Sequence, residues 1–99
     1  SGFAAFAAAK FGLRAVAQAM ARELGPKNIH VVHLLIDAGV DSPAIHERMK
    51  ARSGVEAADI PPDSLTRTAS IAEAYWFAHQ QTRDGWTHEL DLRPSVERW

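Results

Sequence analysis

The feature that most restricts the fold of this chain is the apolar run Ile29 to Ile36, which reads Ile-His-Val-Val-His-Leu-Leu-Ile. A short, nearly continuous run rich in β-branched residues is typical of a parallel strand covered on both faces of its sheet. Such a strand needs neighbours on both sides, and the sequence holds one further candidate strand, Trp86 to Leu92. Because two strands make a poor sheet alone, the pattern predicts one edge of a larger α/β layer.

A long helix is predicted ahead of the first strand. Ala4 to Leu24 consists mostly of strong helix formers and is apolar almost all round until Arg14. A helix of this kind is expected to be buried on several sides. Gly25 followed by Pro26 predicts its end, with the glycine at the position just past the helix.

A second helix is predicted after the first strand. The residues from Asp37 to Asp41 form a turn, and Ser42 with Pro43 makes an N-cap and N1 pair that opens a helix from Ala44 to about Arg52. The residues from 53 to 62 are expected to form a loop, which two consecutive prolines close.

The last part of the chain predicts a third helix and a second strand. Ser70 and Glu73 have the spacing of a capping box, and the helix reaches about Gln80. Asp84-Gly85 is a turn signal. In the strand Trp86 to Leu92, alternate residues are expected to point to opposite faces, with Glu89 on the face opposite Trp86 and Leu90.

Composition excludes several classes of function. The formal net charge is −1 and no block of Lys or Arg occurs, so we expect no nucleic-acid partner. Cysteine is absent, which predicts no disulfide and no thiolate metal site and fits a cytoplasmic location. No apolar run is long enough to span a bilayer, so we expect no membrane partner. Because an apolar helix follows an initial Ser1 almost at once, we also expect the chain to be part of a longer protein.

Several segments resemble the short-chain dehydrogenase/reductase family. Ser1 to Lys10 resembles the segment that carries the family's Tyr-x-x-x-Lys motif, and Ala17 to Leu24 resembles the later part of that helix. Lys27 to Val31 resembles the following strand, where the family usually shows Ile-Arg-Val-Asn. Asp37 to Ser42 stands where the family has Pro-Gly-x-Val-x-Thr.

The resemblance continues to the end of the chain, through Ser70 to Ala74 for the last helix and Glu89 to Leu92 for the final strand. It implies the α/β fold class, with residues 1–99 as the C-terminal portion of one Rossmann-like doubly wound parallel sheet. The element order would be helix, strand, helix, helix, strand. The fragment would be incomplete as a nucleotide-binding domain, because the missing N-terminal half of the same fold carries the glycine-rich turn and the catalytic serine.

The resemblance also assigns catalytic positions. In the family, the tyrosine exchanges a proton with the substrate oxygen, and the lysine lowers the tyrosine pKa and binds the nicotinamide ribose. Lys10 matches the lysine, but Phe6 stands at the tyrosine position, where it cannot donate a proton. The residues alone predict a solvated lysine at Lys10 and a core aromatic at Phe6; only the resemblance assigns Lys10 to the ribose. Pro-Gly after the strand is also replaced, by Ile36, Asp37 and Ala38.

Further cofactor contacts are implied at Val40 and Ser42, which match positions that touch the nicotinamide carboxamide. Ser42 can serve as a helix N-cap at the same time. The cofactor implied for the family is NAD or NADP, but no pyrophosphate site is present at a helix N-terminus here. We therefore expect no cofactor binding by this chain alone.

Other polar and aromatic residues bear on metal, acid–base and pocket roles. The histidines show no ligand spacing, and no metal site is predicted; they are His30, His33, His46, His79 and His88. Asp37 and Asp41 are either a carboxylate pair for acid–base work or turn residues that accept from local backbone amides. The aromatic residues from Tyr75 to Phe77 are expected to line a pocket or to place at least one ring in the core.

Two functions follow from these residues. The first is the C-terminal segment of an NAD(P)-dependent oxidoreductase of this family, inactive as an isolated chain. The alternative is a non-catalytic module that forms a homo-oligomer through the Ala4–Leu24 helix, since family members commonly pair through this helix. Small residues would allow close approach of two copies; they are Ala4, Ala7, Ala8, Ala15 and Ala19.

Overall fold

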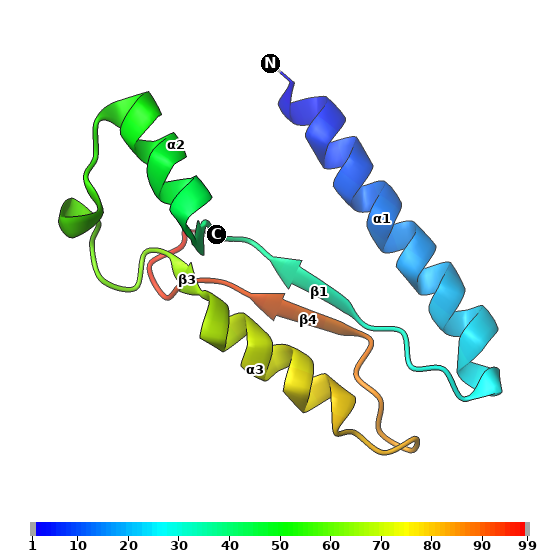
Figure 1. The fold of residues 1–99 in the computed structure, drawn as a ribbon. Helices are drawn as coiled ribbons and strands as arrows, with labels where there is room; N and C mark the ends of the chain where they lie inside the picture. The colour runs from blue at the N-terminus through cyan, green and yellow to red at the C-terminus, as the bar shows by residue number, and fades with distance from the viewer. Residues whose placement is uncertain (1, 99) are drawn as a thin grey trace.

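The computed structural model describes residues 2–98 (Figure 1); Ser1, the first residue of the segment that resembles the Tyr-x-x-x-Lys region, lies outside them, as does Trp99. The elements in chain order are α1 (Phe3–Leu24), η1 (Gly25–Lys27), β1 (His33–Ile36), β2 (Val40–Asp41), α2 (Pro43–Ser53), η2 (Ala57–Asp59), β3 (Thr66–Arg67), α3 (Thr68–His79) and β4 (Glu89–Leu92). The three helices and two main strands that the sequence predicts are therefore present.

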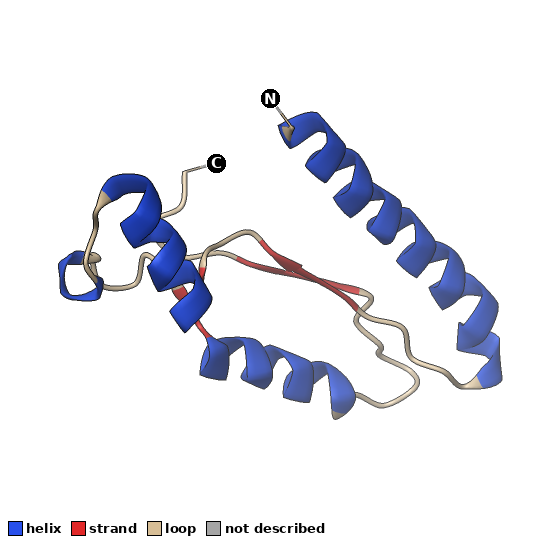
Figure 2. Cartoon of the chain, turned by 45° about the horizontal axis from the view of Figure 1, so that its top comes forward, coloured by secondary structure: helices blue, strands red, loops and turns tan. Residues whose placement is uncertain are grey.

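The centre of the fold is the parallel pair β1–β4, in which His33 lies opposite Glu89 and Ile36 opposite Leu92. Helix α1 lies on one side of this pair and α3 on the other, as Figures 1 and 2 show from two directions. Helices on both faces of parallel strands confirm the predicted α/β class and match part of a Rossmann-like doubly wound sheet.

Both strands are shorter than predicted, and histidine side chains make contacts with backbone carbonyls just before the ladder begins. The imidazole of His30 is 2.7 Å from the carbonyl oxygen of Thr87, and that of His88 is 3.0 Å from the carbonyl oxygen of Val31. The ring of His30 also stacks on Trp86, with centroids 4.7 Å apart. Side-chain contacts thus join residues 29–32 to residues 86–88 without strand geometry.

A second parallel pair, β2–β3, joins Val40 to Thr66 and Asp41 to Arg67. The prediction of a simple turn from 37 to 41 was therefore wrong at its last two residues. The amide of Thr66 donates to the carbonyl oxygen of Gly39 over 2.9 Å. A Cβ atom on Gly39 would lie 2.8 Å from a methyl carbon of Leu65, so glycine permits this close approach.

Helix α1 ends at Leu24 as predicted, but two details of the predicted helix ends were wrong. Gly25 has right-handed backbone (φ −53°) and continues into η1, while Asn28 takes the left-handed conformation (φ 66°). Asparagine tolerates this conformation better than most residues, and Pro26 suits the first turn of a short helix. Helix α3 begins at Thr68 with no side-chain cap, so the predicted capping box of Ser70 and Glu73 does not form.

The predicted burial of α1 on several sides was also wrong for this chain. Among the described residues, only Ala17 and Ala78 are buried. The aromatic residues from Tyr75 to Phe77 are all more than half exposed, so none of these rings is in a core. The reason is geometric: a pair of four-residue strands is too narrow to cover a 22-residue helix. Within residues 2–98, no helix is both long and apolar enough to cross a membrane.

Candidate functional site

The first part of the candidate site is the N-terminal half of α1. Phe6 and Lys10 are one helical turn apart, and the ammonium nitrogen of Lys10 lies 5.6 Å from the centre of the Phe6 ring. This contact confirms that the two residues share a face of the helix. The side chain of Phe6 is 57% exposed, which makes it a surface aromatic in this chain rather than a core residue.

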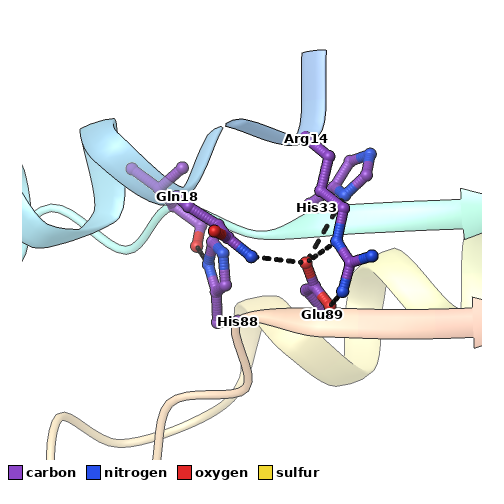
Figure 3. Close-up of polar contacts among 6 residues, drawn as sticks. Arg14, Gln18, His33, His88 and Glu89 are labelled. Atoms are coloured by element: carbon purple, nitrogen blue, oxygen red, sulfur yellow. Dashed lines mark hydrogen bonds and ion pairs between the residues drawn. The ribbon is translucent and has the colours of Figure 1, made fainter. Parts of the chain in front are cut away.

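Further along the helix, α1 is joined to β4 by side-chain contacts (Figure 3). Arg14 binds Glu89 through two hydrogen bonds, from Nε to Oε1 over 2.7 Å and from Nη2 to Oε2 over 2.9 Å. The amide nitrogen of Gln18 also donates to Oε1 of Glu89 over 3.4 Å. A bidentate contact between a guanidinium and a carboxylate fixes the relative orientation of the two groups as well as their distance.

The electrostatics of this contact follow from its geometry. The hydrogen bonds from Arg14 lower the pKa of the Glu89 carboxyl, because they favour its charged form. The same bonds raise the pKa of Arg14. His33 is the third residue beside this carboxylate: its Nδ1 lies 4.0 Å from Oε1 of Glu89 and is buried without a hydrogen-bond partner among the described residues.

Sequence reasoning missed this cluster around Glu89. The available signal was the spacing of Phe6, Lys10, Arg14 and Gln18, which fall four residues apart along one helix. That spacing makes each of these residues the neighbour of the next on the helix surface. It does not identify a carboxylate far along the chain as the partner.

The second part of the candidate site is the β2–α2 junction. Val40 pairs with Thr66 in the β2–β3 ladder, and the hydroxyl oxygen of Ser42 accepts a hydrogen bond from the amide of Ile45 over 3.4 Å. Ser42 is therefore the N-cap of α2, as predicted. Among residues 2–98, no hydrogen bond or ion pair links Val40 or Ser42 to Phe6 or Lys10. The two parts are positioned independently.

The turn aspartates do not form a carboxylate pair. Asp37 pairs with Arg93, which also binds Asp91 over 2.9 Å, and the bond to Asp91 raises the pKa of Arg93. Asp41 instead contacts His46, with 2.6 Å between Oδ1 and Nε2. Both carboxylates contact side chains, so the alternative, in which they accept from local backbone amides, does not describe them either.

The histidines are dispersed over the fold. His30 stacks on Trp86, His46 contacts Asp41, and His79 lies 5.5 Å from Trp76, ring centre to ring centre. In the part of the chain that the structure describes, no group of three or more His, Cys, Asp or Glu residues is arranged to hold a metal ion. The absence of a metal site stays a prediction.

A solved structure similar to this chain is the crystal structure of a short-chain dehydrogenase from Rhodopseudomonas palustris. The two are 49% identical in sequence, with a TM-score of 0.61. The similarity covers 95% of this chain and 31% of that chain, so the chain spans about a third of the length of that protein. No family model and no curated protein matches the sequence. The similarity relates this chain to part of an oxidoreductase.

Proposed function

We propose that this chain is the C-terminal segment of an NAD(P)-dependent oxidoreductase of the short-chain dehydrogenase/reductase family. The observation that carries the proposal is the 49% identity to a short-chain dehydrogenase along 95% of this chain. The missing N-terminal half would supply the nucleotide-binding turn. We also propose a cytoplasmic location, in keeping with the absence of cysteine.

The residues of the candidate site fit the nicotinamide end of such a cofactor. The exposed ammonium of Lys10 has three donors suited to ribose hydroxyls. The hydroxyl of Ser42 accepts from Ile45 and still has its own proton to donate to a carboxamide oxygen. When bound, the nicotinamide would supply the hydride exchanged with a carbonyl or alcohol carbon. Phe6 has no hydroxyl and cannot move the accompanying proton.

The isolated chain is proposed to be inactive and to bind neither NAD nor NADP. Much of the binding affinity for a dinucleotide comes from a pyrophosphate site at a glycine-rich turn and helix N-terminus. The N-cap residues are Gly2 for α1 and Arg67 for α3, and neither helix start has a side-chain cap or the glycine-rich sequence of such a turn. The cofactor contacts available here are those of the nicotinamide end.

The test is Phe6→Tyr in the full-length gene product, assayed with NADH and NADPH on a panel of ketones and with the oxidised cofactors on alcohols. Restoring a general acid is expected to raise turnover by roughly 100- to 10,000-fold. Phe11→Tyr, which adds a hydroxyl to another exposed phenylalanine of α1, is the matched control and should change nothing. Brisk turnover by the wild type with no gain from Phe6→Tyr would show that the proton comes from elsewhere. A full-length protein that binds neither cofactor would contradict the oxidoreductase proposal.

The second candidate is a non-catalytic module that forms a homo-oligomer through α1. It is favoured by the large apolar side chains that α1 leaves exposed; they are Phe3, Phe6, Phe11, Leu13, Val16 and Met20. Contiguous apolar surface of this kind marks association sites, and closed two-fold assemblies are the commonest.

Light scattering after size exclusion tests the second candidate. Val16→Glu should convert a dimer or larger assembly to a monomer, because a carboxylate would be buried without a partner. Ala51→Glu, on an exposed position of α2, is the control and should leave the assembly unchanged. A wild-type protein that is already a folded monomer would eliminate this candidate.

A further inference from the structure

One stripe of α1 carries both the candidate site and the contact with β4. Phe6, Lys10, Arg14 and Gln18 follow one another at intervals of four residues. Phe6 and Lys10 contact each other at the N-terminal end of the stripe, and Arg14 and Gln18 both bind Glu89. The stripe therefore has one half exposed for a ligand and one half fixed to the sheet.

Helix α1 is attached to β4 by a few oriented hydrogen bonds rather than by a large packed surface. Ala17 is the only buried residue among those described in α1, so packing within this chain does little to set the rotation of the helix about its axis. The two hydrogen bonds between Arg14 and Glu89, of 2.7 and 2.9 Å, set this rotation instead. Lys10 lies one turn before Arg14, about 6 Å along the axis at 1.5 Å per residue. Whatever fixes Arg14 also fixes the direction in which Lys10 projects.

We propose that Glu89 is a positioning residue for the nicotinamide cofactor, acting through Arg14 to hold the Lys10 face of α1 toward the ribose. The inference rests on the proposed function, since Lys10 must bind the cofactor for its direction to matter. Glu89 itself touches neither cofactor nor substrate. Its carboxylate accepts from Arg14 and Gln18 and lies 4.0 Å from His33 Nδ1.

A double-mutant cycle in the full-length protein tests this role. The dissociation constants for NADH and NADPH are measured by cofactor fluorescence for wild type, Glu89→Gln, Lys10→Ala and the double variant. Glu89→Gln is expected to weaken binding about tenfold, within the range of energies that coupled side chains show. If Glu89 acts through Lys10, adding Glu89→Gln to Lys10→Ala should cost little more, because the residue being positioned is already gone. A role in general stability would instead give additive losses.

Two further variants keep the result interpretable. Asp91→Asn is the matched control, because Asp91 is also a β4 carboxylate bound to an arginine, Arg93, and should leave cofactor affinity unchanged. The charge-reversed pair Arg14→Glu with Glu89→Arg keeps the contact and should recover most of the affinity lost in Glu89→Gln. Additive losses, or an equal loss in Asp91→Asn, would overturn the inference and leave the proposed function standing. A wild-type protein that binds neither cofactor would overturn both.

Discussion

The two parts of the candidate site are held in place by different kinds of interaction. Helix α1, with Phe6 and Lys10, is fixed by a side-chain ion pair between Arg14 and Glu89. The β2–α2 junction, with Val40 and Ser42, is fixed by the backbone ladder to β3 and by the close approach at Gly39. An ion pair responds to charge, salt and pH. A close approach to the backbone is instead disturbed by added side-chain volume.

This difference separates the perturbations that should affect each part. A carboxylate-to-amide change leaves side-chain volume almost unaltered, so it should disturb α1 and spare the junction. An added methyl group leaves charge unaltered, so it should disturb the junction and spare α1. The predictions below apply one perturbation at a time to the full-length protein.

The largest effect is expected from Gly39→Ala. The new Cβ would lie 2.8 Å from the Leu65 methyl, closer than van der Waals contact, so the Leu65 side chain must shift. Because that methyl is the end of a flexible side chain, we expect a loss of about 1–2 kcal/mol, the lower part of the range for overpacking. Chemical denaturation measures the free energy of unfolding.

The control for this change is Gly85→Ala, where the new Cβ would meet nothing within 4 Å. In a Leu65→Ala background, Gly39→Ala should cost no more than Gly85→Ala, because the atom in the way has been removed. An equal cost in both backgrounds would mean that the backbone of Gly39, rather than its contact with Leu65, sets the requirement for glycine.

A smaller effect is expected from Ser42→Ala. The change removes the N-cap bond to the amide of Ile45, which is long at 3.4 Å. We expect a loss of about 0.5–1 kcal/mol, the lower part of the range for N-caps. Ser53→Ala, at the last residue of the same helix, is the control and should cost less, because its hydroxyl donates to the carbonyl of Met49, which does not cap the helix. Equal losses at the two serines would argue against a capping role.

The sequence predicts those parts of the fold that depend on local patterns. The β-branched run before Ile36 marks a parallel strand, and Ser42 followed by Pro43 marks the start of α2. The face shared by Phe6 and Lys10 also follows from helical spacing, and the structure confirms it.

The rest depends on contacts that no local pattern encodes. Glu89 looks like one member of an alternating strand, and its pairing with Arg14 spans 75 positions of sequence. The ladder of Val40 with Thr66 requires the chain to return after α2 and η2, and a two-residue strand carries no periodicity. The capping-box spacing of Ser70 and Glu73 occurs in the sequence, yet the ladder to β3 brings the start of α3 forward to Thr68. Tertiary pairing thus overrides a local signal.

The smallest effect, and the most specific to α1, concerns pH. The bonds from Arg14 lower the pKa of Glu89 below its ordinary value of 4.5. The unfolded chain therefore binds a proton at this group more readily than the folded chain does. The stabilisation is complete above the unfolded value and is lost as pH falls through the lower, folded pKa. Glu89→Gln, which has no such proton to bind, should reduce stability near neutral pH and progressively less toward acid.

The measurement is the unfolding midpoint of wild type and Glu89→Gln from about pH 6 to about pH 3, where carboxylates titrate. The difference in unfolding midpoint between the two proteins should narrow as pH falls. It should also narrow in high salt, which screens a partly exposed ion pair. Glu73→Gln removes a carboxylate of α3 that forms no ion pair among the described residues. The difference in unfolding midpoint between this variant and wild type should therefore stay small and constant. A Glu89→Gln gap that is independent of both pH and salt would mean that the neutral hydrogen bonds of this side chain, not its charge, hold α1 on the sheet. The same result would remove the reason for expecting the two parts of the site to respond to different perturbations.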